Sequence, residues 1–192
     1  MTTPKGEARR EAIVAAAADL VVRQGPGAVS HRTAATAAGV PLAATTYYFR
    51  DLADLRVAAV DRVAEQELAR AAELVAALPT GRRSTGETAA RVVDVLLGAH
   101  CRTDDQVLAF YERFLAGGRH PELRPTLQAT RARLDALVGQ VLTGGGHRDV
   151  PVGRLVALAD GTALSALVEG RGEARSATEA AVADLISRRR RW

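Results

Sequence analysis

The sequence predicts an all-α protein, and three observations favour that class. The strong helix formers Ala, Leu, Arg and Glu dominate its 192 residues. Aromatic residues make up 4% of the chain, and no stretch shows the polar/β-branched alternation of a half-buried strand. Short segments rich in glycine and proline interrupt the helical pattern. We therefore expect helices throughout, joined by short loops.

These interruptions define about nine expected helices. The breaks fall at 24–27, 38–41, 78–86, 117–125, 144–151 and 169–176. The expected helices span about 7–24, 30–38, 42–48, 51–77, 87–102, 104–117, 122–143, 152–170 and 177–190. The second and third are too short to be stable in isolation, so they must pack on their neighbours.

Composition limits the class of protein. The single cysteine, Cys101, excludes an intrachain disulfide and makes a reduced cytoplasm the expected location. The apolar N-terminal stretch is interrupted by Glu7, Glu11 and Asp19, so it resembles a helix more than a signal peptide. No run approaches the roughly 18 uninterrupted apolar residues of a membrane span. We expect a soluble protein with no membrane partner.

Charge alone does not indicate a nucleic-acid binder. The net charge is +4, and all but one of the 26 basic residues are arginines, whose guanidinium groups suit phosphates and base edges. A composition rich in Ala and Arg is also what a GC-rich genome encodes. DNA binding therefore has to be argued from a motif.

The motif lies at about residues 30–49. Ala35 is followed four residues later by Gly39, then by Val40, Pro41 and a second short helical stretch. A small residue at Ala35 lets two helices approach closely, and Gly39 tolerates the positive φ of a tight turn. Ser30 is suited to cap the first of these helices. This is helix-turn-helix spacing, although a simple helical hairpin fits the spacing as well.

A helix-turn-helix would place the second short helix in a major groove of DNA. Thr45, Thr46 and Tyr47 would face the bases, where threonine methyl groups suit thymine methyl groups. Tyr48 and Arg50 would lie near the flanking phosphates. The expected DNA-binding residues are Ser30, His31, Arg32, Leu42, Ala43, Thr45, Thr46, Tyr47, Tyr48 and Arg50.

The segments SHRTAATAAGVP, ATTYYF and RDLADLRVAAV, following a first helix in this order, resemble the tetracycline-repressor-like (TetR) family over about residues 7–66. The resemblance implies a homodimeric helical repressor with a variable body that binds a small effector and dimerises. It implies a DNA-binding domain at 7–66 and an effector-binding and dimerisation domain at 67–192, with Phe49 anchoring the recognition helix. Ala34, Thr45 and Thr46 depart from the usual family residues, which affects individual contacts more than DNA binding itself.

A ligand pocket is expected in the middle helices, which gather the scarce polar and aromatic side chains. Phe110 and Phe114 share one helical face, and large apolar pockets with a few polar groups are typical ligand sites. That the phenylalanines are ordinary core residues remains an open alternative. The expected pocket residues are His100, Phe110, Tyr111, Arg113 and Phe114.

No metal site, cofactor or catalytic residue is expected. His100 and Cys101 are adjacent, so on a helix they point about 100° apart and form a poor metal pair. The chain has no glycine-rich phosphate loop and no GxSxG elbow, and no motif marks Cys101 as a nucleophile.

The last two expected helices carry apolar faces rich in small residues. The family resemblance implies that they pair with their symmetry mates in a four-helix bundle. That they only close the core of one protomer remains an open alternative. The expected interface residues are Leu155, Leu158, Leu164, Leu167, Val182, Leu185 and Ile186.

The sequence thus predicts a transcriptional regulator that binds a double-stranded operator as a homodimer and is released by an unidentified small effector. A shift of the fourth helix would change the spacing of the two recognition helices, which DNA fixes at roughly 34–36 Å. A DNA-binding protein controlled by a protein partner is the first alternative, and a helical enzyme is the second.

Overall fold

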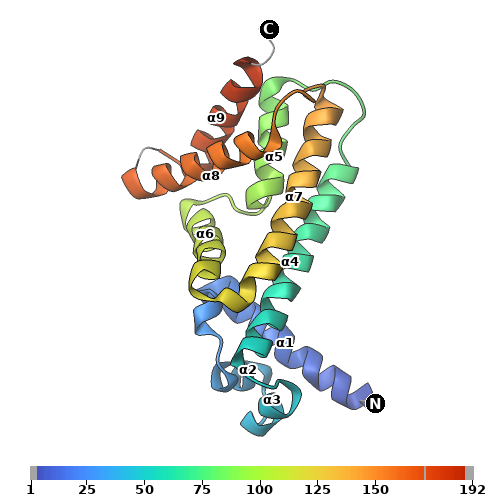
Figure 1. Cartoon of the computed structure of the whole chain (residues 1–192), viewed down its shortest axis with the longest axis vertical. Coiled ribbons are helices and arrows are strands. Elements are labelled where there is room, and N and C mark those ends of the chain that lie inside the picture. Colours follow the sequence, from blue (N-terminus) through green and yellow to red (C-terminus); the bar gives the residue numbers. More distant parts are fainter. Residues whose placement is uncertain (1–3, 171, 189–192) are drawn as a thin grey trace. The chain divides into compact units, whose positions relative to one another are not determined.

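The computed structural model describes residues 4–170 and 172–188 (Figure 1). Over these residues the chain forms nine α-helices and two short 3-10 turns and contains no strand, which confirms the all-α prediction. The helices are α1 (Pro4–Gln24), α2 (His31–Ala38), α3 (Leu42–Tyr48), α4 (Leu52–Ala76), α5 (Thr85–Leu97), α6 (Asp104–Arg119), α7 (Arg124–Gly145), α8 (Val152–Glu169) and α9 (Ala174–Arg188). The 3-10 turns are η1 (Pro26–Ala28) and η2 (Pro121–Leu123).

Three helix boundaries differ from the expected ones by three residues or more, and the first is the start of α1, which lies at Pro4 and not at residue 7. The helix expected to reach residue 102 ends at Leu97, because Gly98 adopts a φ of +91° and the chain leaves the helix there. The last helix begins at Ala174, three residues before the expected start, and its expected end at 189–190 lies outside the described residues. Among the described helices, none is long and apolar enough to cross a membrane.

The turn between α2 and α3 has the local chemistry that the motif requires. The Ser30 hydroxyl accepts a hydrogen bond from the Thr33 backbone N–H at 3.0 Å, and Thr33 Oγ1 accepts one from the Ser30 N–H at 2.9 Å. At the other end Gly39 has a φ of +65°, and the Val40 N–H donates to the Ala35 carbonyl at 3.0 Å. The expected cap and the expected glycine turn are both confirmed.

The chain packs into two compact units. Unit 1 comprises the chain up to Gln66 together with Glu112–Thr130, and unit 2 comprises Glu67–Tyr111 and the chain from Arg131 onward. The boundaries fall inside α4, α6 and α7, so each of these helices contributes residues to both units. The functional domains expected at 7–66 and 67–192 remain predictions.

The core of unit 1 brings α1, α2, α4 and the corner between α6 and α7 together. Phe49, 1% exposed, lies in this core as expected, and the guanidinium carbon of Arg10 lies 5.2 Å from its ring centroid. Leu123 of η2 is fully buried there, although it is far from the helix-turn-helix in sequence. Other buried members are Ile13, Ala17, Val21, Ala34, Leu55 and Ala59.

The core of unit 2 is built from α5, α7, α8 and α9 with parts of α4 and α6. It contains a polar anchor: the buried Tyr111 hydroxyl donates to Asp160 Oδ1 at 2.9 Å, and Arg131 Nη2 lies 3.2 Å from Asp160 Oδ2. Burial and the Asp160 charge both raise the pKa of Tyr111 above its ordinary value. The phenol therefore remains a hydrogen-bond donor at any physiological pH.

Substituting Leu123 tests whether the α6–α7 corner is part of the unit 1 core. Leu123→Ala should lower the free energy of unfolding by about 2–5 kcal/mol, because a fully buried leucine leaves a cavity when truncated. Urea unfolding at fixed protein concentration measures the change. The matched control is Leu115→Ala, whose side chain on α6 is 57% exposed. Equal destabilisation by the two variants would contradict the assignment.

Candidate DNA-binding surface and ligand cavity

Helix α3 presents a small exposed surface that suits close approach to DNA. Tyr47 is 80% exposed and Leu42 is 48% exposed, and Ala43 and Thr46 are exposed beside them. The Tyr48 ring is half-buried and meets the Tyr47 ring edge-on, with 5.0 Å between the centroids. The side chains on this face are short or aromatic, so nothing long shields the helix from a groove.

Thr45 is a correction to the sequence prediction, because it does not face outward. Its side chain is fully buried, and its hydroxyl donates to the Leu42 carbonyl at 2.8 Å. Since successive helical residues turn by about 100°, Thr45 falls on the same side of α3 as the partly buried Ala44 and Tyr48. Thr45 thus fills a core position and cannot contact bases directly.

The other expected DNA-binding residues lie at the edges of this surface. Ser30 and His31 are half-buried at the start of α2, where the Ser30 hydroxyl is engaged in the cap, and Arg32 is exposed. The Arg50 side chain is 85% exposed, with its Nε 3.3 Å from Asp51 Oδ2. A hydrogen bond from the Asp54 backbone N–H, aided by Arg50, lowers the pKa of Asp51. Asp51 therefore stays charged and competes with phosphate for Arg50.

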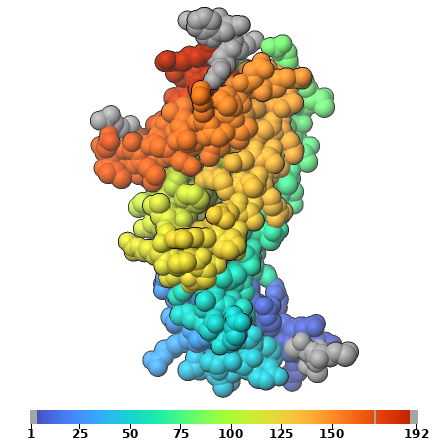
Figure 2. Space-filling view, viewed as in Figure 1, coloured from blue at the N-terminus to red at the C-terminus, as the bar shows by residue number. Residues whose placement is uncertain are grey.

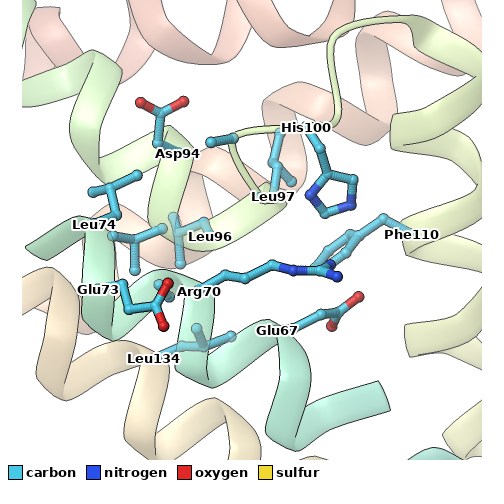
Figure 3. A pocket seen from close by; sticks show the side chains of 14 residues that line it. Glu67, Arg70, Glu73, Leu74, Asp94, Leu96, Leu97, His100, Phe110 and Leu134 are labelled. Atoms are coloured by element: carbon cyan, nitrogen blue, oxygen red, sulfur yellow. The ribbon is translucent and has the colours of Figure 1, made fainter.

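Unit 2 contains a cavity of about 460 Å³ lined by α4, α5, α6, α7 and the loop after α5 (Figure 3). This volume is within the range of small-molecule sites, roughly 300–1,000 Å³. Figure 3 shows the Arg70 side chain reaching from α4 toward Phe110 and His100, with Glu67 and Glu73 on the same helix. The remaining lining residues are Ala71, Leu74, Asp94, Val95, Leu96, Leu97, Gly98, Ala99 and Leu134.

The carboxylates of this cavity differ in their surroundings. Asp94 is 3% exposed and forms ion pairs with Arg175, with Arg91 at 2.8 Å and with Arg102 at 3.5 Å. Its charge is therefore compensated by arginines outside the cavity lining. Glu67 and Glu73 lie three residues on either side of Arg70, so the α4 wall carries two carboxylates and one guanidinium.

The cavity contains two of the five expected pocket residues. His100 and Phe110 line it, whereas Tyr111, Arg113 and Phe114 do not. Phe110 and Tyr111 diverge by about 100° on α6, so Tyr111 points into the core and bonds Asp160. Arg113 and Phe114 belong to the part of α6 that packs in unit 1. The pocket prediction is corrected for Tyr111, and for Arg113 and Phe114 it stays a prediction.

Sequence reasoning missed the polar wall of the cavity on α4. Glu67, Arg70 and Glu73 have the spacing of an ordinary solvated helix face, so their sequence pattern does not indicate that they line a cavity. The available signal was their proximity to Ala71 and Leu74, which continue the apolar stripe of α4 into the cavity wall. Within the described residues, no group of three or more metal-ligating side chains gathers.

Helices α8 and α9 carry a second, open groove of about 490 Å³. Figure 2 shows α8, in orange, at the surface along much of its length. Leu158 is 37% exposed and lines the groove. The other lining residues are small: Ala157, Gly161, Thr162, Ser165, Ala166 and Ala177.

The expected dimer-interface residues divide into two groups. Leu155, Val182 and Ile186 are fully buried in the core of their own unit, so the alternative interpretation applies to them and their assignment to the interface is corrected. Leu158 is exposed on α8. Leu164, Leu167 and Leu185 are half-buried and pack against the same core.

Comparison with known proteins decides the family. Residues 83–188 match the model described as the tetracyclin repressor-like C-terminal domain. The chain belongs to the TetR family. This match lies beyond the N-terminal residues that carry the sequence resemblance, so the resemblance is confirmed from a separate part of the chain. As a TetR-family protein it is a DNA-binding transcriptional regulator.

Solved structures extend the similarity over most of the chain. The multidrug binding protein EbrR complexed with ethidium is 32% identical, with a TM-score of 0.67, over 92% of this chain and 98% of that one. The EbrR complex with proflavin is 31% identical, with a TM-score of 0.68, over 92% and 99%. SCO1917, a TetR-family member from Streptomyces coelicolor A3, is 31% identical, with a TM-score of 0.59, over 92% and 97%. A search of curated proteins gives no match.

Substitutions on α3 test which of its faces reads DNA. Tyr47→Ala should weaken operator binding by about tenfold or more, in line with the roughly 1–3 kcal/mol of a base-reading contact. Fluorescence anisotropy measures the affinity for a DNA fragment that the unaltered protein selects from a genomic library. Thr45→Val is the control, because it removes a buried hydroxyl and should change affinity less than about twofold. Unchanged affinity in Tyr47→Ala, with the protein folded, would refute the assignment.

Proposed function

We propose that the protein is a homodimeric repressor that leaves its operator when an aromatic cation binds in the cavity of unit 2. One observation carries this proposal: an apolar cavity of about 460 Å³ has Glu67 and Glu73 on the wall that also bears Arg70. The similar protein EbrR is described in complex with ethidium, proflavin and malachite green, all of which are aromatic cations.

The chemistry of the cavity favours a cation over an anion. A charged ligand that enters an apolar cavity loses its hydration, which is costly unless an opposite charge lies nearby. Glu67 and Glu73, which line the cavity on α4, would supply that charge. The Phe110 ring would add a π-face for a flat cation. Arg70 opposes such a ligand and would have to move away from it.

For DNA binding, the domain at 7–66 would insert α3 into the major groove. Leu42, Ala43, Thr46 and Tyr47 face outward for base contacts, and Tyr48 lies at the edge of that face. The helix start at Ser30 and His31 and the side chains of Arg32 and Arg50 would fix the position on the phosphate backbone. Because the net charge of the chain is only +4, specificity would depend on dimeric fit to two grooves more than on bulk attraction.

The coupling between ligand and DNA would pass through α4. Residues Leu55 and Ala59 of this helix lie in the unit 1 core, and Glu67 and Arg70 line the cavity. A ligand that displaces Arg70 therefore acts on the same continuous helix that supports the DNA-binding domain. The effector shifts the equilibrium only to the extent that it binds the two arrangements with different affinity.

A movement of α4 would be transmitted to the segment before the helix-turn-helix through the contacts of Arg56. Its Nη1 donates to Glu122 Oε1 at 2.9 Å and lies 3.3 Å from His120 Nδ1. Its Nε donates to the Pro26 carbonyl at 3.2 Å, in the turn just before α2. A hydrogen bond from its own backbone N–H lowers the pKa of Glu122, and the neighbouring Arg56 and His120 lower this pKa further. All these contacts lie within unit 1.

The enzyme alternative retains one supporting observation. Glu67, Arg70, Glu73 and His100 converge on the cavity, and a catalytic site also requires converging ionisable groups. Mass spectrometry of a bound ligand after prolonged incubation distinguishes an enzyme from a regulator. An enzyme changes the mass of the ligand, whereas a regulator leaves the ligand unchanged.

Charge substitutions in the cavity test the ligand class, with ethidium as the probe. Glu67→Gln and Glu73→Gln should each weaken ethidium binding by about 3- to 10-fold, and Arg70→Gln should strengthen it by a similar factor, because charge complementarity changes with opposite sign. Ethidium fluorescence measures the Kd. Glu112→Gln removes one negative charge from an exposed site outside the cavity and should leave the Kd unchanged. The same Kd in all four variants would exclude the proposed site.

A charge on α8 tests the homodimer. Leu158→Glu places a carboxylate in the proposed interface, where an unpaired buried charge is strongly unfavourable, so sedimentation velocity should show monomers. Operator affinity should also fall when the dimer dissociates, because a monomer binds only one half-site of the operator. Val22→Glu, at a 45% exposed position on α1, should remain dimeric. A stable Leu158→Glu dimer would exclude this face of α8 as the interface.

A further inference from the structure

The loop that follows α5 forms one wall of the cavity and is held by an arginine from α9. Gly98, Ala99 and His100 of this loop line the cavity. Arg175 Nη1 donates to the Gly98 carbonyl at 3.2 Å and to the Cys101 carbonyl at 3.0 Å. Both carbonyls lie outside the helical pattern. The Gly98 carbonyl also accepts from the Cys101 N–H at 3.1 Å, and Arg175 adds a hydrogen bond to each of the two carbonyls.

Arg175 is itself fixed by two carboxylates. Its side chain is 8% exposed, and its Nη2 donates to Asp94 Oδ1 on α5. Its Nε lies 3.0 Å from Glu179 Oε1, one turn further along α9. A planar guanidinium with five donors bridges several acceptors in this way, whereas a lysine ammonium offers a single point of attachment.

The start of α9 also holds the far end of the loop. The Ala174 backbone N–H donates to Asp104 Oδ1 at 2.9 Å, at the first residue of α6. The two neighbouring residues Ala174 and Arg175 therefore hold the loop from Gly98 to Asp104 at both of its ends. All of these residues lie in unit 2.

The conformation of this loop determines where the His100 side chain lies. A Cβ atom added at Gly98 would come within 2.7 Å of His100 Cε1 and 2.9 Å of His100 Nδ1, so the imidazole packs directly on the glycine. Gly98 also has a φ of +91°, which disfavours any other residue. The position of the imidazole in the cavity wall thus depends on the backbone that Arg175 holds.

We infer that Arg175 is a positioning residue of the ligand cavity: it holds the Gly98–Cys101 backbone so that His100 forms part of the cavity wall, and it ties that wall to α9. The inference rests on the proposed function only in that the cavity is the ligand site. It assigns Arg175 a role beyond compensating the buried charge of Asp94, since Arg91 and Arg102 also pair with Asp94.

The experiment compares Arg175→Gln with Arg91→Gln and Arg102→Gln, which remove partners of Asp94 without touching the loop carbonyls. Two measurements apply to each variant: the Kd for ethidium and the NMR resonance of the His100 imidazole. The chain has four histidines, so a His100→Ala variant assigns that resonance. Arg175→Gln should shift the His100 resonance and weaken ethidium binding by about tenfold, because misplacement of a wall residue disturbs ligand fit. Arg91→Gln and Arg102→Gln should leave the His100 resonance unchanged, because neither side chain contacts the loop carbonyls.

Two further variants keep the test decisive if Arg175→Gln does not fold. The double variant Asp94→Asn/Arg175→Gln removes the buried charge together with its partner. Gly98→Ala disturbs the same imidazole from the loop side while Arg175 is intact. Both should shift the His100 resonance, and Gly98→Ala should also weaken ethidium binding. A third variant, Arg175→Lys, should lose less than Arg175→Gln in both measurements, because it retains the charge next to Asp94.

The possible outcomes separate this inference from the proposed function. An unchanged His100 resonance in a folded Arg175→Gln or double variant overturns the inference. Equal shifts of the His100 resonance in Arg91→Gln, Arg102→Gln and Arg175→Gln also overturn it, since charge compensation alone would then explain the effect. If the unaltered protein does not bind ethidium, the proposed ligand class fails, and the His100 resonance alone still decides the role of Arg175.

Discussion

Helix α4 has to satisfy two environments with one continuous set of backbone hydrogen bonds. Its 25 residues, Leu52–Ala76, correspond to about 37 Å of helix and contain neither glycine nor proline, so no residue type favours a kink. The early turns bury Leu55 and Ala59 among α1 and the helix-turn-helix. The later turns place Glu67 and Arg70 in the ligand cavity. The proposed coupling of ligand binding at one end of α4 to DNA binding at the other requires this continuity.

The arginines of this chain have a structural role that its composition does not reveal. Arg56 donates to the Pro26 carbonyl, and Arg175 donates to the Gly98 and Cys101 carbonyls. In each case the acceptor lies in an irregular segment beside a proposed functional element, and a carboxylate fixes the guanidinium. Partly buried arginines thus add hydrogen bonds to the backbone carbonyls of the turns that they contact.

Local signals in the sequence predicted most of the secondary structure. Ser30 and Gly39 could be assigned because capping and positive φ each depend on a few neighbouring residues, whereas the anchoring role of Phe49 was implied by the family resemblance. The end of α5 was expected at residue 102, because the sequence does not show that Gly98 turns the chain and that Arg175, 77 residues away, holds it there. Tertiary contacts of this kind override local helix propensity.

The functional residues were less predictable because they depend on which side of a helix faces inward. Thr45 and Tyr111 are polar enough to suggest binding sites, yet both are buried and both hydroxyls are satisfied inside the protein. Leu155 is an apolar residue of the kind found in helical interfaces, but its side chain is fully buried in the core of its own unit. Glu67 and Arg70 were missed because charged residues on a long helix resemble a solvated face, and Arg70 is in fact exposed although both residues line the cavity.

The central claim is that a ligand in the cavity changes the separation of the two recognition helices of a dimer. The most direct measurement is the distance between two spin labels at Ala37→Cys, an exposed position on α2, in a protein whose buried Cys101 is replaced by alanine. DNA requires the two recognition helices to lie roughly 34–36 Å apart. Saturating ethidium should shift the label distance by several ångströms from its value in the operator-bound dimer. An unchanged distance, at an ethidium concentration that releases the operator, would contradict this account.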